Sequence, residues 1–110
     1  MALIVYVDVD DTLVRTTGST VMPIPGVIAH VRHLYESGAR LYCWSAGGDV
    51  YARQIAERLG IVECFSGYLS KPHLMLDDQA PSEWPGFAVQ HPAACVGKPD
   101  YSDLLNYHSR

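Results

Sequence analysis

Hydrophobic and polar positions fall along the chain in blocks that favour strands and helices in turn. The first apolar run covers residues 3–7 and is rich in β-branched and aromatic side chains, which is typical of a strand buried on both faces. Residues 40–44 form a second such run, and residues 61–65 a shorter third one. A short apolar run at residues 73–76 predicts a fourth strand, and residues 87–89 fit a fifth.

Two segments between these runs have the spacing of amphipathic helices. The first is predicted over residues 25–38, where apolar residues recur at i, i+3 and i+4 between a Pro-Gly pair and a glycine stop. The second begins at Asp49, a suitable N-cap, and ends at Gly60. A short third helix is predicted over residues 101–107.

The stretches between these elements contain proline, glycine and polar residues, which favour loops. Residues 15–25 are predicted to form a loop or short flap, and residues 66–72 a turn. Strands that alternate with helices imply a parallel sheet with right-handed crossovers. The 110 residues suffice for one core, so we predict a single α/β domain over residues 1–110, built as a three-layer sandwich around a central parallel sheet.

Carboxylates follow directly on two of the predicted strands. Asp8, Asp10 and Asp11 come after the first strand, and Asp77 and Asp78 after the fourth. Carboxylates repel one another and are costly to bury, so such a cluster requires a cation or a shared proton. One aspartate can attack, a second can carry a proton and a hard cation can bind both. Because ligands bind beyond the carboxyl ends of parallel strands, these groups are expected to meet at one edge of the sheet.

The order of these motifs resembles that of the haloacid dehalogenase (HAD) superfamily of aspartate-nucleophile phosphatases. The first motif, an apolar strand followed by DxDx[TV], is matched by residues 8–12, and the second, a strand ending in Ser or Thr, by residues 41–45. Lys71 comes third, and residues 74–78 match the fourth, a strand ending in paired acids. The resemblance covers residues 3–78 and implies a Rossmann-like, HAD-like fold.

The resemblance also implies a reaction, the hydrolysis of a phosphate monoester through an aspartyl-phosphate on Asp8, with Asp10 as general acid and base. Ser45 and Lys71 complete the implied catalytic residues. The implied phosphate-binding residues are Asp11, Thr12, Ser45, Ala46, Gly47 and Lys71. The implied cofactor is Mg²⁺, with Asp8, Asp10 (through its backbone carbonyl) and Asp77 or Asp78 as ligands.

The chain departs from the family pattern at Asp11 and in the spacing between Lys71 and Asp77, and it contains a second candidate for the catalytic lysine. Asp11 stands where the family often has glycine, and a turn-shaping role is preferred for it. Lys98 lies in a Gly-Lys-Pro sequence that is locally closer to the third motif, but it follows the paired acids, so the order favours Lys71. Lys71 and Asp77 are six residues apart, which leaves no room for the usual intervening helix. This compressed arrangement resembles small capsular polysaccharide or sugar-phosphate phosphatases.

No segment is long enough for a cap domain, so the site is expected to be open. An open site favours a phosphorylated macromolecule as substrate, or a homo-oligomer in which a neighbouring subunit forms the lid. A phosphorylated small molecule, such as a sugar phosphate or nucleotide, is the other candidate substrate. The net charge of -4 and the scattered basic residues disfavour nucleic acid as a partner. The first apolar run is too short for a secretory signal or a membrane span, which predicts a cytoplasmic protein without a membrane partner.

Two alternative functions stay open at this point. The chain fits an inactive HAD-like domain that serves in binding or interaction, although both Asp8 and Asp10 are present. A receiver domain of two-component signalling also combines a parallel sheet, Mg²⁺ and a phosphorylated aspartate at about this length. A receiver carries its acceptor aspartate on the third strand, however, and residues 61–65 contain none.

Overall fold

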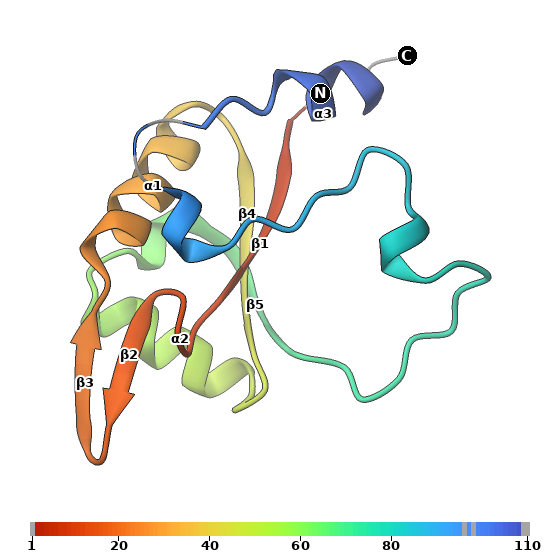
Figure 1. Cartoon of the computed structure of the whole chain (residues 1–110). Coiled ribbons are helices and arrows are strands. Elements are labelled where there is room, and N and C mark those ends of the chain that lie inside the picture. The colour runs from red at the N-terminus through yellow and green to blue at the C-terminus, as the bar shows by residue number, and fades with distance from the viewer. Residues whose placement is uncertain (1, 96, 98, 109–110) are drawn as a thin grey trace.

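The computed structural model describes residues 2–95, 97 and 99–108, and its main elements are three helices and five strands (Figure 1). The strands are β1 (Ile4–Asp8), β2 (Val14–Thr17), β3 (Thr20–Pro23), β4 (Arg40–Ser45) and β5 (Phe65–Ser70). The α-helices are α1 (Pro25–Glu36), α2 (Asp49–Arg58) and α3 (Ser102–His108), and short 3-10 helices are η1 (Val62–Cys64), η2 (Pro81–Glu83) and η3 (Pro92–Cys95).

The main sheet is parallel and has the strand order β1-β4-β5. Val5 lies beside Leu41 and Val7 beside Cys43, so both strands direct these apolar side chains to one face. The connection from β1 to β4 through α1 and the connection from β4 to β5 through α2 advance in the same direction across the sheet. Right-handed connections of this kind place their helices on the same face. Figure 1 shows α1 and α2 on that one side of the three strands. The predicted α/β class with a parallel sheet is confirmed. The predicted three-layer sandwich is not seen among the described residues, because α1 and α2 both cover the same face of the sheet (Figure 1).

The core lies between this face and the two helices. Leu41 and Cys43 are completely buried there. The buried hydrophobic residues are Val7, Val9, Leu13, Val14, Val27, Val31, Leu34, Leu41, Cys43, Ala52, Ile55, Ala56, Ile61, Cys64 and Phe65. The opposite face of the sheet is more open: Ile4 is 61% exposed, and Tyr6, 50% exposed, packs edge-on against Trp44.

The helices begin and end close to the predicted positions. Proline in the first turn of α1 suits the helix start, because its missing N–H has no intrahelical acceptor there. Gly38, with φ +95°, adopts after α1 a left-handed conformation that favours glycine. Helix α2 begins one residue earlier than predicted, since Gly48 (φ +105°) is the N-cap and Asp49 the first helical residue.

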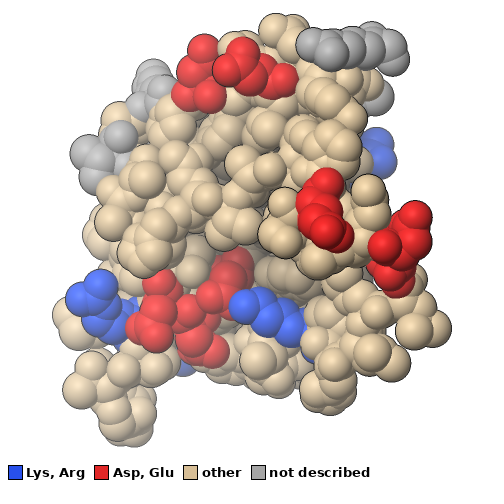
Figure 2. Space-filling model, turned by 45° about the vertical axis from the view of Figure 1, so that its right-hand side comes forward, with Lys and Arg blue, Asp and Glu red and all other residues tan. Residues whose placement is uncertain are grey.

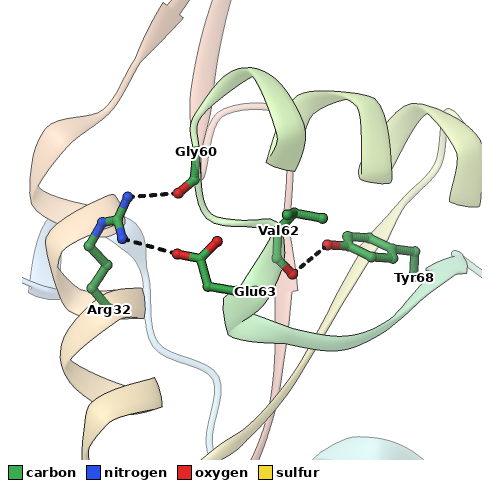
Figure 3. Close-up of polar contacts among 5 residues, drawn as sticks. All are labelled: Arg32, Gly60, Val62, Glu63 and Tyr68. Atoms are coloured by element: carbon green, nitrogen blue, oxygen red, sulfur yellow. Dashed lines mark hydrogen bonds and ion pairs between the residues drawn. The ribbon is translucent and has the colours of Figure 1, made fainter.

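A polar link ties α1 to the connection between α2 and β5 (Figure 3). Arg32 Nη2 donates to the carbonyl of Gly60 at 2.8 Å, and Arg32 Nη1 lies 3.4 Å from Glu63 Oε1. Nearby, the hydroxyl of Tyr68 on β5 donates to the carbonyl of Val62 at 3.0 Å. These contacts hold η1 and the start of β5 in place at the end of the sheet that is opposite to the carboxyl ends of the strands.

Two of the predicted connections contain strands instead. The predicted loop over residues 15–25 contains the antiparallel hairpin β2–β3. The predicted turn over residues 66–72 was wrong, because β5 extends to Ser70, and the predicted third strand over residues 61–65 is mostly η1. Gly67, which suggested a turn, lies inside β5 against the ring of Tyr42. Glycine occurs inside strands where another group approaches the backbone closely.

The fourth and fifth strands were predicted wrongly. Residues 73–76 and 87–89 form no strand, and Leu74 and Leu76 are 76% and 93% exposed. Between β5 and η3 the chain leaves the sheet in a long excursion that contains only the single turn η2 (cyan in Figure 1). No helix in the described part of the chain is long and apolar enough to cross a membrane.

Candidate functional site

The carboxyl ends of the three parallel strands bring together most of the predicted site residues. The strands end at Asp8, Ser45 and Ser70, and Lys71 follows Ser70 directly. The side chain of Asp8 is 33% exposed, so solvent and a small ligand can reach it. The site therefore lies where an open parallel sheet places its ligands.

The turn after β1 positions Asp8 and Thr12. Asp11 has φ +61°, a left-handed conformation that aspartate tolerates better than most residues, and its amide donates to the carbonyl of Val14 at 2.7 Å. The carbonyl of Val9 accepts the amides of the three residues after Asp11, the first being Thr12 at 3.2 Å. This tight turn leaves the Thr12 hydroxyl 3.2 Å from Asp8 Oδ2, to which it donates. These contacts fit the turn-shaping role preferred for Asp11.

Lys71 lies against the other oxygen of Asp8. Its backbone amide donates to the carbonyl of Ser45 at 2.9 Å, which fixes the residue at the end of β5. Its Nζ lies 3.1 Å from Asp8 Oδ1 and 5.7 Å from the centre of the Trp44 ring. An ammonium group over an aromatic face is attracted by the ring. The competing Lys98 lies outside the described residues.

Ser45 and the loop after it are held by internal hydrogen bonds. The Ser45 side chain is almost inaccessible, with the residue 1% exposed, and its Oγ accepts the amide of Gly47 at 3.0 Å. The amide of Gly48 donates to the carbonyl of Ser45 at 3.1 Å. Ala46 is exposed at the tip of this loop. Phosphate binding by Ser45, Ala46 and Gly47 stays a prediction, since these contacts describe how the loop is built.

Asp10 has a partner that the sequence reasoning missed. The hydroxyl of Tyr51, in the first turn of α2, donates to Asp10 Oδ1 at 2.8 Å. Burial and the neighbouring Asp10 carboxylate raise the pKa of Tyr51 to about 12, so the phenol stays protonated at neutral pH. The only sequence signal was the position of Tyr51 in the first helical turn after Gly47 and Gly48.

Ser70 is a second residue that the motif reading missed. Its Oγ accepts the amide of Asp49 at 3.1 Å and so supplies the first turn of α2 with a hydrogen-bond acceptor. The sequence predicts a turn at Ser70, whereas in the structure this residue ends β5. Its contact with Asp49 links the end of β5 to the start of α2.

Asp77 and Asp78 do not join the other carboxylates. Both are exposed on the excursion after β5, and Asp77 Oδ1 accepts the amide of Gln79 at 2.9 Å in a local turn. Among the described residues, no three His, Cys, Asp or Glu side chains are grouped closely enough to share a metal ion. The expected convergence therefore holds for Asp8 and Ser45 and not for the paired acids.

The oxygen donors at the strand ends suit a Mg²⁺ ion that takes few of its ligands from the protein. This ion commonly keeps several waters and takes one or two carboxylates from the protein. Asp8 supplies an accessible carboxylate, and Asp10 lies two residues further along the same turn. The Asp8 carboxylate and the Asp10 backbone carbonyl are oxygen donors of the kind that such an ion takes.

Charge is concentrated at this edge. On the face shown in Figure 2, a cluster of acidic groups is flanked by basic side chains, while the other acidic groups lie apart.

Burial, with a further contribution from Asp8, raises the pKa of the Cys43 thiol to about 12. Cys43 is therefore a completely buried, protonated core residue beneath the site, an environment that disfavours a cysteine nucleophile.

Comparisons of the chain with models of protein families, with curated proteins and with solved structures gave no match.

Proposed function

We propose that this chain is a Mg²⁺-dependent phosphatase of the HAD type, which hydrolyses a phosphate monoester through an aspartyl-phosphate on Asp8. The observation that carries the proposal is the environment of Asp8: an accessible carboxylate at a strand end, with Lys71 on one oxygen and Thr12 on the other. A second carboxylate, Asp10, lies on the same turn and has a separate partner. This is the pair that two-step phosphoryl transfer requires.

In the first step a carboxylate oxygen of Asp8 attacks the phosphorus atom, and the bond between phosphorus and the ester oxygen breaks. Asp10, in its protonated form, gives its proton to the departing oxygen, so an alcohol leaves. Lys71 offsets the negative charge that gathers between Asp8 and the phosphoryl group. The products of this step are the free alcohol and phosphorylated Asp8.

In the second step water attacks the phosphorus of the aspartyl-phosphate. Asp10, now a carboxylate, accepts a proton from that water, and the bond between phosphorus and Asp8 breaks. Inorganic phosphate leaves, and both aspartates return to their starting forms. Bound Mg²⁺, held by Asp8 and the backbone carbonyl of Asp10, would offset negative charge between the nucleophile and the phosphate ester. Ligation by Asp77 or Asp78 would require a different arrangement of residues 72–80.

The proposal extends to the fold. The order β1-β4-β5 with two helices on one face is compatible with a Rossmann-like, HAD-like core without a cap domain. An uncapped site admits a sugar phosphate, a nucleotide or a phosphorylated macromolecule, and a neighbouring copy of the chain could cover it.

The test is hydrolysis of p-nitrophenyl phosphate by the purified chain with Mg²⁺, with EDTA, and by the Asp8→Asn variant. We expect metal-dependent release of p-nitrophenol that Asp8→Asn abolishes while its circular dichroism spectrum is unchanged. Trapping with beryllium fluoride, which mimics an aspartyl-phosphate, should protect the wild-type protein against thermal unfolding and leave Asp8→Asn unaffected. Turnover that persists at the wild-type rate in Asp8→Asn would show that Asp8 is not the nucleophile.

A further inference from the structure

Tyr51 is the side chain that anchors Asp10. Its hydroxyl donates to Asp10 Oδ1 at 2.8 Å from the first turn of α2, 41 residues further along the chain. Within residues 2–95, 97 and 99–108, no other side chain forms a hydrogen bond or ion pair with Asp10. Asp8, by contrast, is held by Thr12 and Lys71. The two carboxylates therefore have separate partners.

The ring of Tyr51 is itself fixed by packing. A Cβ atom placed on Gly47 would lie 2.9 Å from Tyr51 Cδ2, so the ring rests against the backbone of the loop after β4. The ring is partly buried, and a phenol keeps its proton at neutral pH. A fixed ring with a permanent O–H donor limits where the Asp10 carboxyl group can lie.

We propose that Tyr51 is a positioning residue for proton transfer: its hydroxyl holds the Asp10 side chain at the place where it protonates the leaving oxygen. This inference rests on the proposed phosphatase function, in which Asp10 is the general acid. Tyr51 acts through Asp10 and needs no contact with the substrate. Such neighbours keep a catalytic group in its correct geometry. Displacement of that group lowers the reaction rate steeply.

This role predicts a dependence on the leaving group. The p-nitrophenolate ion is a weak base and departs readily without a proton, whereas phenolate is a stronger base and gains more from protonation as it leaves. The two aryl esters have the same ring and differ little in shape. A defect in the acid should therefore appear mainly with phenyl phosphate, and a general loss of structure should affect both esters alike.

The experiment compares kcat/KM for phenyl phosphate and p-nitrophenyl phosphate in wild-type protein, Tyr51→Phe, Asp10→Asn and Tyr68→Phe. The ratio kcat/KM includes departure of the leaving group and excludes later hydrolysis of the phosphoenzyme. Tyr68→Phe is the matched control, since Tyr68 is also partly buried and its hydroxyl donates to the carbonyl of Val62 away from the site (Figure 3). Both Phe variants keep the ring and lose one hydrogen bond.

We expect Tyr51→Phe to lose about tenfold more kcat/KM on phenyl phosphate than on p-nitrophenyl phosphate, with a larger split in the same direction for Asp10→Asn. Tyr68→Phe should show no split. In the Asp10→Asn background, Tyr51→Phe should cause little further loss, because the two residues act as one unit.

Two results would overturn the inference, and they can be told apart. Equal losses on both esters in Tyr51→Phe, with wild-type turnover that depends on Asp8, would leave the phosphatase function standing and remove the role of Tyr51. Wild-type protein without Asp8-dependent turnover of either ester would overturn the phosphatase function, and the role of Tyr51 with it.

Discussion

Asp8 and Asp10 are two positions apart on the chain, yet different elements hold their side chains. Thr12 from the same turn and Lys71 from the end of β5 contact Asp8, and Tyr51 from α2 contacts Asp10. A carboxylate beside a lysine is shielded from an anionic substrate, and one beside a phenol is oriented without being neutralised. The different environments give each aspartate a separate role in the proposed reaction.

At the residue scale, replacing Lys71 tests the charge that faces Asp8. We expect Lys71→Ala to lower kcat for p-nitrophenyl phosphate by about 10²–10³-fold, because a donor aimed at developing charge is lost. Lys71→Arg should recover part of the rate, since it keeps the charge. Lys98→Ala, assayed side by side, should stay at the wild-type rate. A loss confined to Lys98→Ala would mean that Lys98 is the catalytic lysine.

Gly47 provides a second test, which does not depend on catalysis. In Gly47→Ala the new methyl group would meet the Tyr51 ring at 2.9 Å, and the ring or the loop must shift. Urea denaturation should show a loss of about 1–3 kcal/mol in the free energy of unfolding, as for other overpacked sites.

Gly26→Ala is the control for this change. A Cβ atom at Gly26, in the first turn of α1, meets nothing within 4 Å. That variant should be unchanged or more stable by up to about 1 kcal/mol, because alanine restricts the unfolded chain. Equal losses in the two variants would contradict the packing of Tyr51 on Gly47.

At the scale of elements, the C-terminal segment is joined to α1 through a buried histidine. His30 is 6% exposed, its Nε2 lies 2.8 Å from the hydroxyl of Tyr101, and that hydroxyl also donates to Gln90. The Nδ1 atom of His30 is buried and has no hydrogen-bond partner among the described residues. Burial, and secondarily the nearby His33, lowers the pKa of His30 below 6.5.

This arrangement predicts a loss of stability in acid. In the unfolded chain His30 takes up a proton near pH 6.5, and in the folded protein only at lower pH, so the unfolded state binds more protons between the two values. The free energy of unfolding should therefore fall as the pH drops below about 6.5, by at most about 1.4 kcal/mol per pH unit from this group.

Urea denaturation between pH 7.5 and pH 5, values chosen to bracket the ordinary histidine pKa of about 6.5, measures this effect. The acid-dependent part should shrink in His30→Gln and persist in His73→Gln, which removes an exposed imidazole. If His30→Gln kept the full pH dependence, the buried histidine would not be its source.

At the scale of the whole molecule, the core and the excursion after β5 are separate. The Cα radius of gyration is 14.3 Å, somewhat above the value of about 13 Å for a compact domain of this length. The larger radius of gyration agrees with the position of residues 71–90, which extend away from the sheet in Figure 1. The core lies on the face covered by α1 and α2.

Substitutions in the excursion should therefore leave stability unchanged. A Leu74→Ser, Leu76→Ser double variant should differ from wild type by less than about 0.5 kcal/mol in the free energy of unfolding, because both side chains are exposed. Leu41→Ala, at a completely buried position, should cost about 2–5 kcal/mol. A comparable loss in the double variant would show that this segment is packed in solution.

The sequence by itself determined the alternation of strands and helices through α2 and the two carboxylates at the end of β1. These features depend on local patterns: an apolar run, a helical spacing, a glycine stop. The same patterns predicted that the carboxylates after β1 and Ser45 after β4 share one edge, because residues after parallel strands lie there. Thr12 and Lys71 were implied by the resemblance to the HAD superfamily. The structure brings these residues to the strand ends.

Only the tertiary structure decided which distant segments meet. The apolar run at residues 73–76 has the pattern of a strand, but a strand forms only where an edge pairs with it, and here none does. Gly67 reads as a turn residue until the ring of Tyr42 lies against it. Tyr51 carries no motif, and its role depends on a contact across 41 residues that no local pattern encodes.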